Sequence, residues 1–200
     1  MELFDSETKN RDYLFKFLKD NGEIAKQNCH IGTEIPVPYK HIYFPIRNSL
    51  EIWCFKQDIC IYQKLFDKNI GRKGITINSS GKRVLNVTIE NESKDNDVGM
   101  PFVIIETKLA KTKTEDILAT SEKIKMIKSI FPYWKAYLLI FGLPHSRIYR
   151  LCSGFDEILF MTDFNEKRID DINKKINNGF NLSYGNVPFV FSYNYPYGPE

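Results

Sequence analysis

Residues 101–108, PFVIIETK, decide the fold of this 200-residue chain. The five apolar residues predict a strand buried in a core. The Glu-Thr-Lys that follows marks the point where this strand leaves the core, either at an ordinary surface or at an active site. Glu106 and Lys108 are two residues apart, so on a strand both side chains point to the same face. An acid and a base placed in this way form either a surface ion pair or part of a catalytic site.

The segments around this strand indicate an α/β core. Two β-rich runs within residues 74–91 flank the turn signal NSSGK and predict a hairpin. Together with the PFVIIETK strand they predict a three-strand antiparallel meander. A helix beginning at Thr114 and stopped by Pro132 follows, and the continuous apolar run KAYLLIFG (135–142) predicts a buried strand. This order predicts a mixed central sheet flanked by helices.

The outer parts of the chain have less regular patterns. An apolar stripe predicts a helix within residues 4–23, and the Pro-rich residues 33–49 predict a loop or short edge strands. Residues 49–71 favour a helix ending near Gly71, with a hairpin around the sequence KQD as the alternative. Residues 146–164 predict further strand, residues 165–178 a helix ended by Gly179, and residues 186–198 an aromatic strand.

No internal repeat or linker divides the sequence, so one domain is expected over residues 1–200. Within it, residues 1–47 would form an N-terminal helix and Pro-rich loop. Residues 48–142 would form the core, and residues 143–200 the C-terminal strands and helix.

The composition excludes several classes of protein. Hydrophobic residues make up 42% of the chain, which is enough for a core and argues against disorder. No apolar run reaches the ~18 residues of a membrane span, and the acidic, polar first residues are unlike a secretory signal, so we expect a cytoplasmic protein without a membrane partner. The net charge of +3 permits a nucleic-acid partner without requiring one. The four cysteines form no CxxC pair, which favours reduced thiols over a zinc site.

The Glu-Thr-Lys sequence has a chemistry suited to phosphodiester hydrolysis. The carboxylate of Glu106 and the carbonyl of Thr107 could hold a hard divalent cation such as Mg²⁺ or Mn²⁺. Lys108 could hold or deprotonate a water, or stabilise charge on a phosphate. Lys111 and Lys113 follow directly and could contact phosphates of a nucleic acid, or lie in a solvated loop.

With these residues in this order, the sequence resembles the PD-(D/E)xK nuclease superfamily, whose fold is restriction-endonuclease-like. GMPFVIIETK (99–108) is similar to the strand ending in Glu-x-Lys in the N-terminal nuclease region of type I restriction subunits. YLLIFGLPHSRIYRL (137–151) is similar to the later strand, turn and strand of that region, and residues 6–18 resemble its opening helix. The resemblance covers residues 70–160 best. The helix after the motif lacks the Gln and Tyr that the type I group often carries.

The resemblance implies a second acid on the strand across from Glu106. If the chain turns about Asp95 between the second run of residues 74–91 and the PFVIIETK strand, Asn86 occupies this position. An amide brings no charge, however, and would lower the affinity for a metal. Asp97, nine residues before Glu106, is the other candidate, and both stay open. The family also often has an acid on its first helix. Glu7 and Glu51 can each fill that role, with ordinary surface acids as the alternative.

The resulting prediction is a Mg²⁺- or Mn²⁺-dependent endonuclease of the restriction or repair type that hydrolyses DNA, with RNA as an open alternative. Cutting a duplex usually requires two such sites, so a homodimer stays open. One alternative is a catalytically lapsed module of the same fold that binds nucleic acid without cutting it. The other is a structural or partner-binding α/β protein in which Glu106 and Lys108 form a surface pair.

Overall fold

Strand β5 (Val98–Leu109) contains the PFVIIETK stretch and lies inside a seven-stranded sheet in the computed structural model of the chain. The structure describes residues 6–21, 29–46, 49–66, 75–79, 83–90, 97–143 and 148–186. β5 pairs antiparallel with β2 (Ser49–Phe66) and parallel with β6 (Lys135–Phe141), so the sheet is mixed. The predicted α/β class, with a mixed sheet flanked by helices, is confirmed.

The other strands extend this sheet in both directions. β1 pairs antiparallel with β2, and β7 pairs parallel with β6. β4 pairs parallel with the first residues of β2, and β3 pairs antiparallel with β4, which confirms the predicted hairpin. The bounds of these strands are β1 (His30–Phe44), β3 (Ile75–Ser79), β4 (Arg83–Glu90) and β7 (Glu157–Met161).

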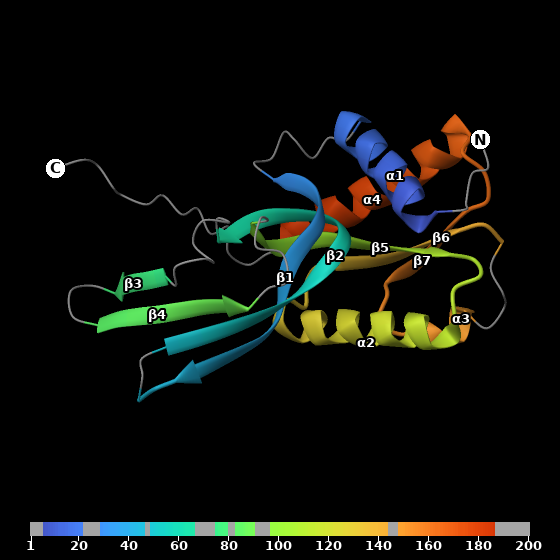
Figure 1. Cartoon of the computed structure of the whole chain (residues 1–200). Helices are drawn as coiled ribbons and strands as arrows, with labels where there is room; N and C mark the ends of the chain where they lie inside the picture. The colour runs from blue at the N-terminus through green and yellow to red at the C-terminus, as the bar shows by residue number, and fades with distance from the viewer. Residues whose placement is uncertain are drawn as a thin grey trace.

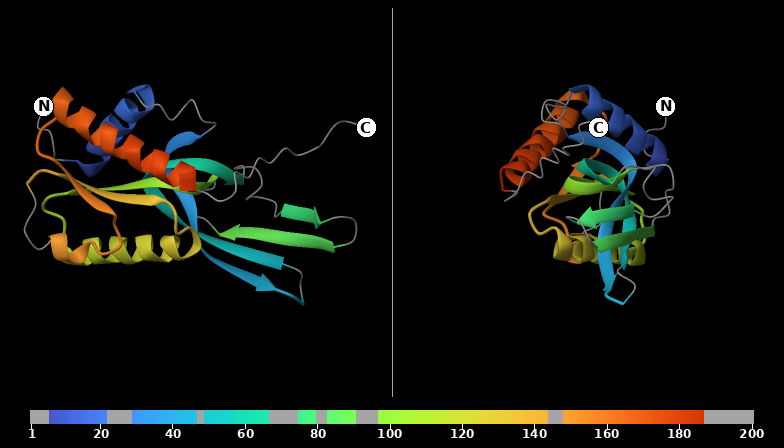
Figure 2. Two further views of the ribbon diagram at one scale, coloured as in Figure 1. Left: turned by 180° about the vertical axis from the view of Figure 1, so that it is seen from behind. Right: turned by 90° about the vertical axis from the view of Figure 1, so that its left-hand side faces the viewer.

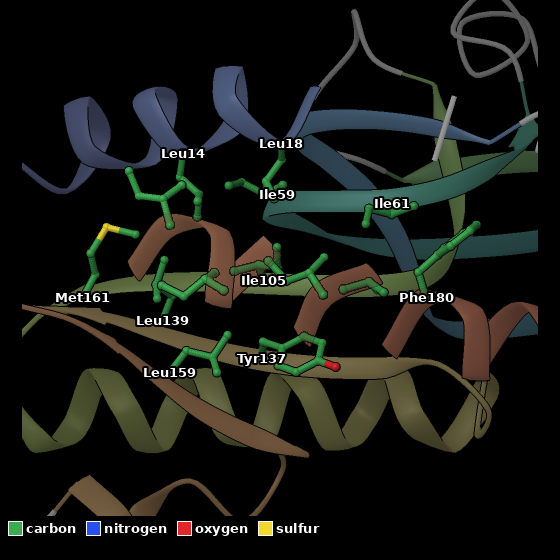
Figure 3. Close-up of a cluster of buried hydrophobic side chains, with 14 of the residues drawn as sticks. Leu14, Leu18, Ile59, Ile61, Ile105, Tyr137, Leu139, Leu159, Met161 and Phe180 are labelled. Atoms are coloured by element: carbon green, nitrogen blue, oxygen red, sulfur yellow. The ribbon is translucent and has the colours of Figure 1, made fainter. Parts of the chain in front are cut away.

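Helices cover the two faces of the central strands. α1 (Glu7–Asn21) and α4 (Glu166–Asn186) lie on one face, and α2 (Thr114–Ile130) lies on the other together with the short α3 (Ile148–Leu151) (Figures 1 and 2). Consecutive residues of β5 therefore enter different cores. Ile105 packs with Leu14 of α1 and Phe180 of α4 (Figure 3), whereas Ile104 packs with Ile124 of α2. Among the described residues, no helix combines the length and the apolar character needed to cross a membrane.

The sheet also has an end that the helices do not cover. β3 and β4 project from the body together with the last residues of β1 and the first residues of β2 (Figure 1). β2 runs through both parts, because its first residues pair with β4 and its later residues pair with β5. The E-T-K end of β5 leads into α2 at the other end of the molecule.

The helix predicted for residues 49–71 is wrong, and so is the alternative hairpin around KQD. Residues 49–66 form the single strand β2. Ile59, Cys60, Ile61 and Tyr62 are all buried, because β1 and β5 flank this part of the strand and helices cover both of its faces. A strand buried on both faces lacks the alternation of apolar and polar residues that would have indicated a strand.

Two further predictions about the sheet are wrong. The Pro-rich residues 33–49 were expected to form a loop or short edge strands, yet most of them belong to the 15-residue strand β1. The predicted meander paired the 74–91 hairpin with β5, but β4 pairs with residues 49–53 of β2, and β5 pairs with β2 and β6. The antiparallel meander of the core is instead β1, β2 and β5, and the β3–β4 hairpin is inserted between its second and third strands.

The C-terminal predictions are correct in part. Residues 146–164 contain α3 and β7 rather than strand alone. The predicted helix exists as α4 but continues through Gly179. This glycine lies against Tyr137, whose ring leaves no room for a Cβ atom, so close packing explains the glycine. The aromatic strand predicted for residues 186–198 lies outside the described residues, except for Asn186 at the end of α4.

Candidate active site

Three carboxylates form a row across three neighbouring strands. Glu34 of β1 lies opposite Asp58 of β2, because the residues before and after them are paired. Glu106 of β5 lies opposite Asp58 on the other side, because each follows or precedes the paired residues Ile105 and Ile59 by one position. Glu34 has φ 55° and is the only non-glycine residue with positive φ among the described residues. Such backbone conformations are uncommon outside glycine and occur often at functional sites. The flanking pairs are Thr33–Ile59, Ile35–Gln57 and Ile59–Ile105.

Glu106 is the buried member of the row. Its side chain is 4% exposed, and Oε1 accepts a hydrogen bond from Nζ of Lys123 on α2 at 3.1 Å. Burial raises the pKa of the Glu106 carboxyl, and the charge of Asp58 raises it further. These effects outweigh the lowering by Lys123 and Lys108. Glu106 is therefore a carboxylate whose charged form is poorly stabilised by its surroundings.

Asp58 is bound directly to the Glu-Thr-Lys sequence. Its Oδ2 accepts hydrogen bonds from the backbone N–H of Thr107 at 2.8 Å and from the Thr107 hydroxyl at 2.9 Å. On its other side, Oδ1 lies 3.9 Å from a guanidinium nitrogen of Arg11 on α1. The same guanidinium nitrogen, Nη1, donates a hydrogen bond to Glu34. Arg11 thus links the two acids of β1 and β2, and Thr107 fixes Asp58 beside Glu106.

Lys108 is held by the first helix. Its Nζ donates a hydrogen bond to Oε1 of Glu7 at 2.9 Å, and its side chain is 15% exposed. Burial lowers the pKa of the Lys108 ammonium, but Glu7, Asp58 and Glu106 outweigh this effect and the pKa is raised. Lys108 is therefore charged at neutral pH. It is suited to orienting a water or neutralising an anion rather than to removing a proton.

A surface cleft of about 490 Å³ opens beside Lys108. It lies between the start of α1, the end of β5 and the first turns of α2, and three of its lining residues are lysines. Lys111 and Lys113, for which the sequence left phosphate contacts and a solvated loop as alternatives, both line this cleft. The lining residues are Glu7, Lys108, Lys111, Thr112, Lys113, Asp116, Ala119 and Thr120.

Both residues proposed to complete the site with Glu106 are in the wrong place. Asp97 precedes β5 at the end opposite Glu106. The two are nine positions apart along the strand, roughly 30 Å at about 3.3 Å per position, and Asp97 binds Lys64 at 2.8 Å. Asn86 of β4 pairs with Ser49, at the far end of β2 from Asp58. Their predicted positions assumed that the hairpin pairs with β5, whereas β5 pairs with β2 and β6.

Of the two acids predicted to lie on the first helix, one lies at the site and the other does not. Glu7 lies on α1 and contacts Lys108, so the structure brings it to the site. Glu51 is not on a helix. It belongs to β2, where it pairs with Ile42 of β1 and Thr88 of β4 in the projecting part of the sheet. Glu51 is therefore not part of this site.

Four residues of the site were not predicted from the sequence: Asp58, Glu34, Arg11 and Lys123. Asp58 carried no signal because the helix predicted for residues 49–71 gave it no position relative to β5. A strand assignment for this segment would have exposed it as the only acid between Glu51 and Asp67. Lys123 carried no signal either, because its position on α2 does not reveal that a buried carboxylate of β5 lies beside it.

The oxygen donors at this site suit a hard divalent cation. The described residues contain no group of three or more His, Cys, Asp or Glu side chains that could hold a metal ion. Mg²⁺ does not require such a group, because it is commonly held by one or two carboxylates together with water and substrate phosphate. Asp58 and Glu106 supply two carboxylates. Burial and the charge of Asp58 both raise the pKa of Glu106, and a bound cation would offset both effects.

Comparisons with known proteins give no family for the chain. Its sequence matches no model of a known protein family, and a search of curated proteins also finds no match.

Proposed function

We propose that the protein is a metal-dependent nuclease with a restriction-endonuclease-like core, which hydrolyses phosphodiester bonds of DNA. The observation that carries this proposal is the position of Asp58. Asp58 lies across from Glu106 and is fixed there by Thr107. Lys108 follows Glu106 by two residues on β5. The family resemblance requires an acid at this place on the neighbouring strand.

The order of the elements gives further support. A helix, three antiparallel strands, a second helix and a strand parallel to the third follow one another as α1, β1, β2, β5, α2 and β6. This is the order expected from the resemblance, with the β3–β4 hairpin inserted before β5. Because Asn86 lies away from Glu106, it no longer gives a reason to favour the catalytically lapsed alternative.

Five residues of the site have a role in this reaction. Asp58, Glu106 and the backbone carbonyl of Thr107 would hold Mg²⁺ or Mn²⁺. The bound cation supplies Lewis-acid polarisation of the phosphate and a more acidic water. Lys108 orients the attacking water and neutralises charge that develops on the phosphate, and Glu7 holds the ammonium in place.

The lysines of the cleft would bind the rest of the substrate. Lys111 and Lys113 contact phosphates on either side of the reacting one, an interaction that does not depend on base sequence. The proposal therefore expects DNA binding that weakens steeply as the salt concentration rises.

The test is cleavage of supercoiled plasmid in the presence of Mg²⁺ or Mn²⁺. The wild-type protein should nick the plasmid, and Lys108→Ala should lower the rate by about 10²–10⁴-fold. Lys125→Ala is the matched control, because Lys125 is exposed on α2 and pairs with Glu122. Circular dichroism should show that both variants are folded.

Unchanged cleavage by Lys108→Ala would refute the proposed mechanism. Salt-sensitive DNA binding without cleavage and without a cation-dependent thermal shift would identify the lapsed module. The absence of any salt-sensitive DNA binding would favour the structural alternative.

A further inference from the structure

The lysine that neutralises Glu106 comes from the helix α2 and not from the Glu-Thr-Lys sequence. Lys123 Nζ lies 3.1 Å from Glu106 Oε1, and the two side chains are 22% and 4% exposed. Lys108, the lysine of the motif, is bound to Glu7 instead. The buried acid of the candidate site thus has a cation beside it that the proposed mechanism does not use.

Lys123 is not one of the residues that line the cleft, but it lies one helical turn from two that do. Ala119 and Thr120 line the cleft from α2, and Lys123 follows them by four and three residues. Residues at these spacings lie on one side of a helix, one turn apart. Lys123 therefore lies on the side of α2 that borders the cleft, while its ammonium contacts Glu106.

A divalent cation held by Glu106 would compete with this ammonium. Both are positive and both bind the same carboxylate, so they repel one another at short distance in a partly buried site, where water screens charge weakly. The Lys123 side chain has the length and flexibility to leave Glu106 for another anion.

We propose that Lys123 is an internal counter-cation of the candidate metal site. It neutralises Glu106 in the cation-free protein, leaves this carboxylate when a divalent cation binds, and then contacts a phosphate of the substrate. This inference rests on the proposed function, because it requires that Glu106 holds a cation.

The first experiment measures Mn²⁺ binding to the full chain without DNA, by isothermal titration calorimetry at low ionic strength and at about pH 8, where carboxylates are ionised. Lys123→Met removes the competing charge and should tighten Mn²⁺ binding by roughly tenfold or more. Lys123→Arg keeps the charge and should bind Mn²⁺ no more tightly than the wild type. Lys125→Met removes a charge from the exposed side of the same helix and should leave the affinity within about twofold.

A second experiment uses the wild-type protein alone, so it does not depend on the stability of a variant. Lysine side chains are acylated with and without Mn²⁺, and the rate at each lysine is measured by mass spectrometry. Acylation of Lys123 should become several-fold faster with Mn²⁺, because the ammonium leaves Glu106. Acylation of Lys125 should not change.

The outcomes separate this inference from the function on which it rests. Tighter Mn²⁺ binding by Lys123→Met, together with faster acylation of Lys123 in the wild type, supports the counter-cation role. If the wild type binds Mn²⁺ but Lys123→Met binds it equally or more weakly, or if Mn²⁺ does not change the acylation of Lys123, the inference is overturned and the proposed function stands. If neither protein binds Mn²⁺, both are overturned.

Discussion

Helix α2 supplies a lysine to two different acids, and the two ion pairs have opposite properties. Lys123 binds Glu106 on β5 at 3.1 Å, and Lys128 binds Asp156, just before β7, at 2.7 Å. The lysines are five residues apart on one helix. The difference between the pairs therefore comes from the surroundings of the two carboxylates.

The carboxylate of Asp156 has hydrogen-bond partners on both of its oxygens. Its Oδ2 also accepts a hydrogen bond from the backbone N–H of Ala136 at 2.7 Å, and Oδ1 accepts one from Lys135 at 3.3 Å. Burial raises the pKa of the Asp156 carboxyl, but the bonds from Lys128 and Ala136 and the charge of Lys135 outweigh it and the pKa is lowered. Asp156 thus connects α2 to β6 and β7, which is a structural role.

Glu106 has the opposite balance. It is more deeply buried, its pKa is raised, and the lysine beside it does not fully compensate the burial and the charge of Asp58. A carboxylate held in an environment that disfavours its charge is a common feature of functional sites. The comparison therefore separates an acid that stabilises the fold from one that is available to bind a cation.

The largest expected effect is on cleavage. Glu106→Gln removes one of the two carboxylates that would hold the cation, and it should lower the rate of Mg²⁺-dependent plasmid nicking by about 10³-fold. Asp156→Asn should leave the rate within about twofold, because Asp156 does not contact the candidate site. Nicking rates at saturating Mg²⁺ measure both. Equal losses in the two variants would show that stability, and not the site, limits the activity.

The next effect is on the free energy of unfolding. Lys123→Met leaves Glu106 buried without its cation, and we expect a loss of about 2–3 kcal/mol, somewhat less than for a completely buried pair. Lys128→Met should cost about 1 kcal/mol or less, since Asp156 is partly exposed and keeps Lys135 and the Ala136 N–H. Urea denaturation at neutral pH compares the two variants. A larger loss for Lys128→Met would contradict the assignment of the roles.

Much of the fold around Glu106 could be predicted from the sequence. β5 and β6 are continuous apolar runs of strand length, and α2 begins at Thr114 with its apolar residues at helical spacing and ends just before Pro132. These signals are local, so they do not depend on which elements lie side by side. Glu106 and Lys108 were found for the same reason, because their spacing on one strand fixes their common face.

The partners of Glu106 could not be predicted in this way. Asp58 is 48 residues away along the chain and is its neighbour only because β2, and not β4, pairs with β5. β2 itself was hidden, since its residues at 59–62 are buried on both faces and resemble a helix segment. Asp97 and Asn86 were chosen by closeness in sequence, which is a poor guide when a hairpin is inserted between paired strands.

The smallest expected effect is the pH dependence of stability, which should have opposite signs for the two acids. The folded pKa of Glu106 is raised, so the folded protein holds this proton more tightly than the unfolded chain. Its contribution is fully present below the ordinary carboxyl pKa and is lost as the pH rises through the raised folded value. Asp156 has a lowered folded pKa, so its contribution is present above the ordinary value and is lost as the pH falls through the lowered one.

Substitution should therefore change the two pH profiles in opposite directions. Relative to the wild type, Glu106→Gln should gain stability as the pH rises from the ordinary carboxyl pKa through the raised pKa of Glu106, by at most about 1.4 kcal/mol per pH unit for this single proton. Asp156→Asn should lose stability relative to the wild type as the pH rises above the lowered pKa of Asp156. Urea unfolding at a series of pH values measures both differences. Parallel profiles for the two variants would mean that the surroundings of Glu106 do not disfavour its charge, and would remove the physical basis for treating it differently from Asp156.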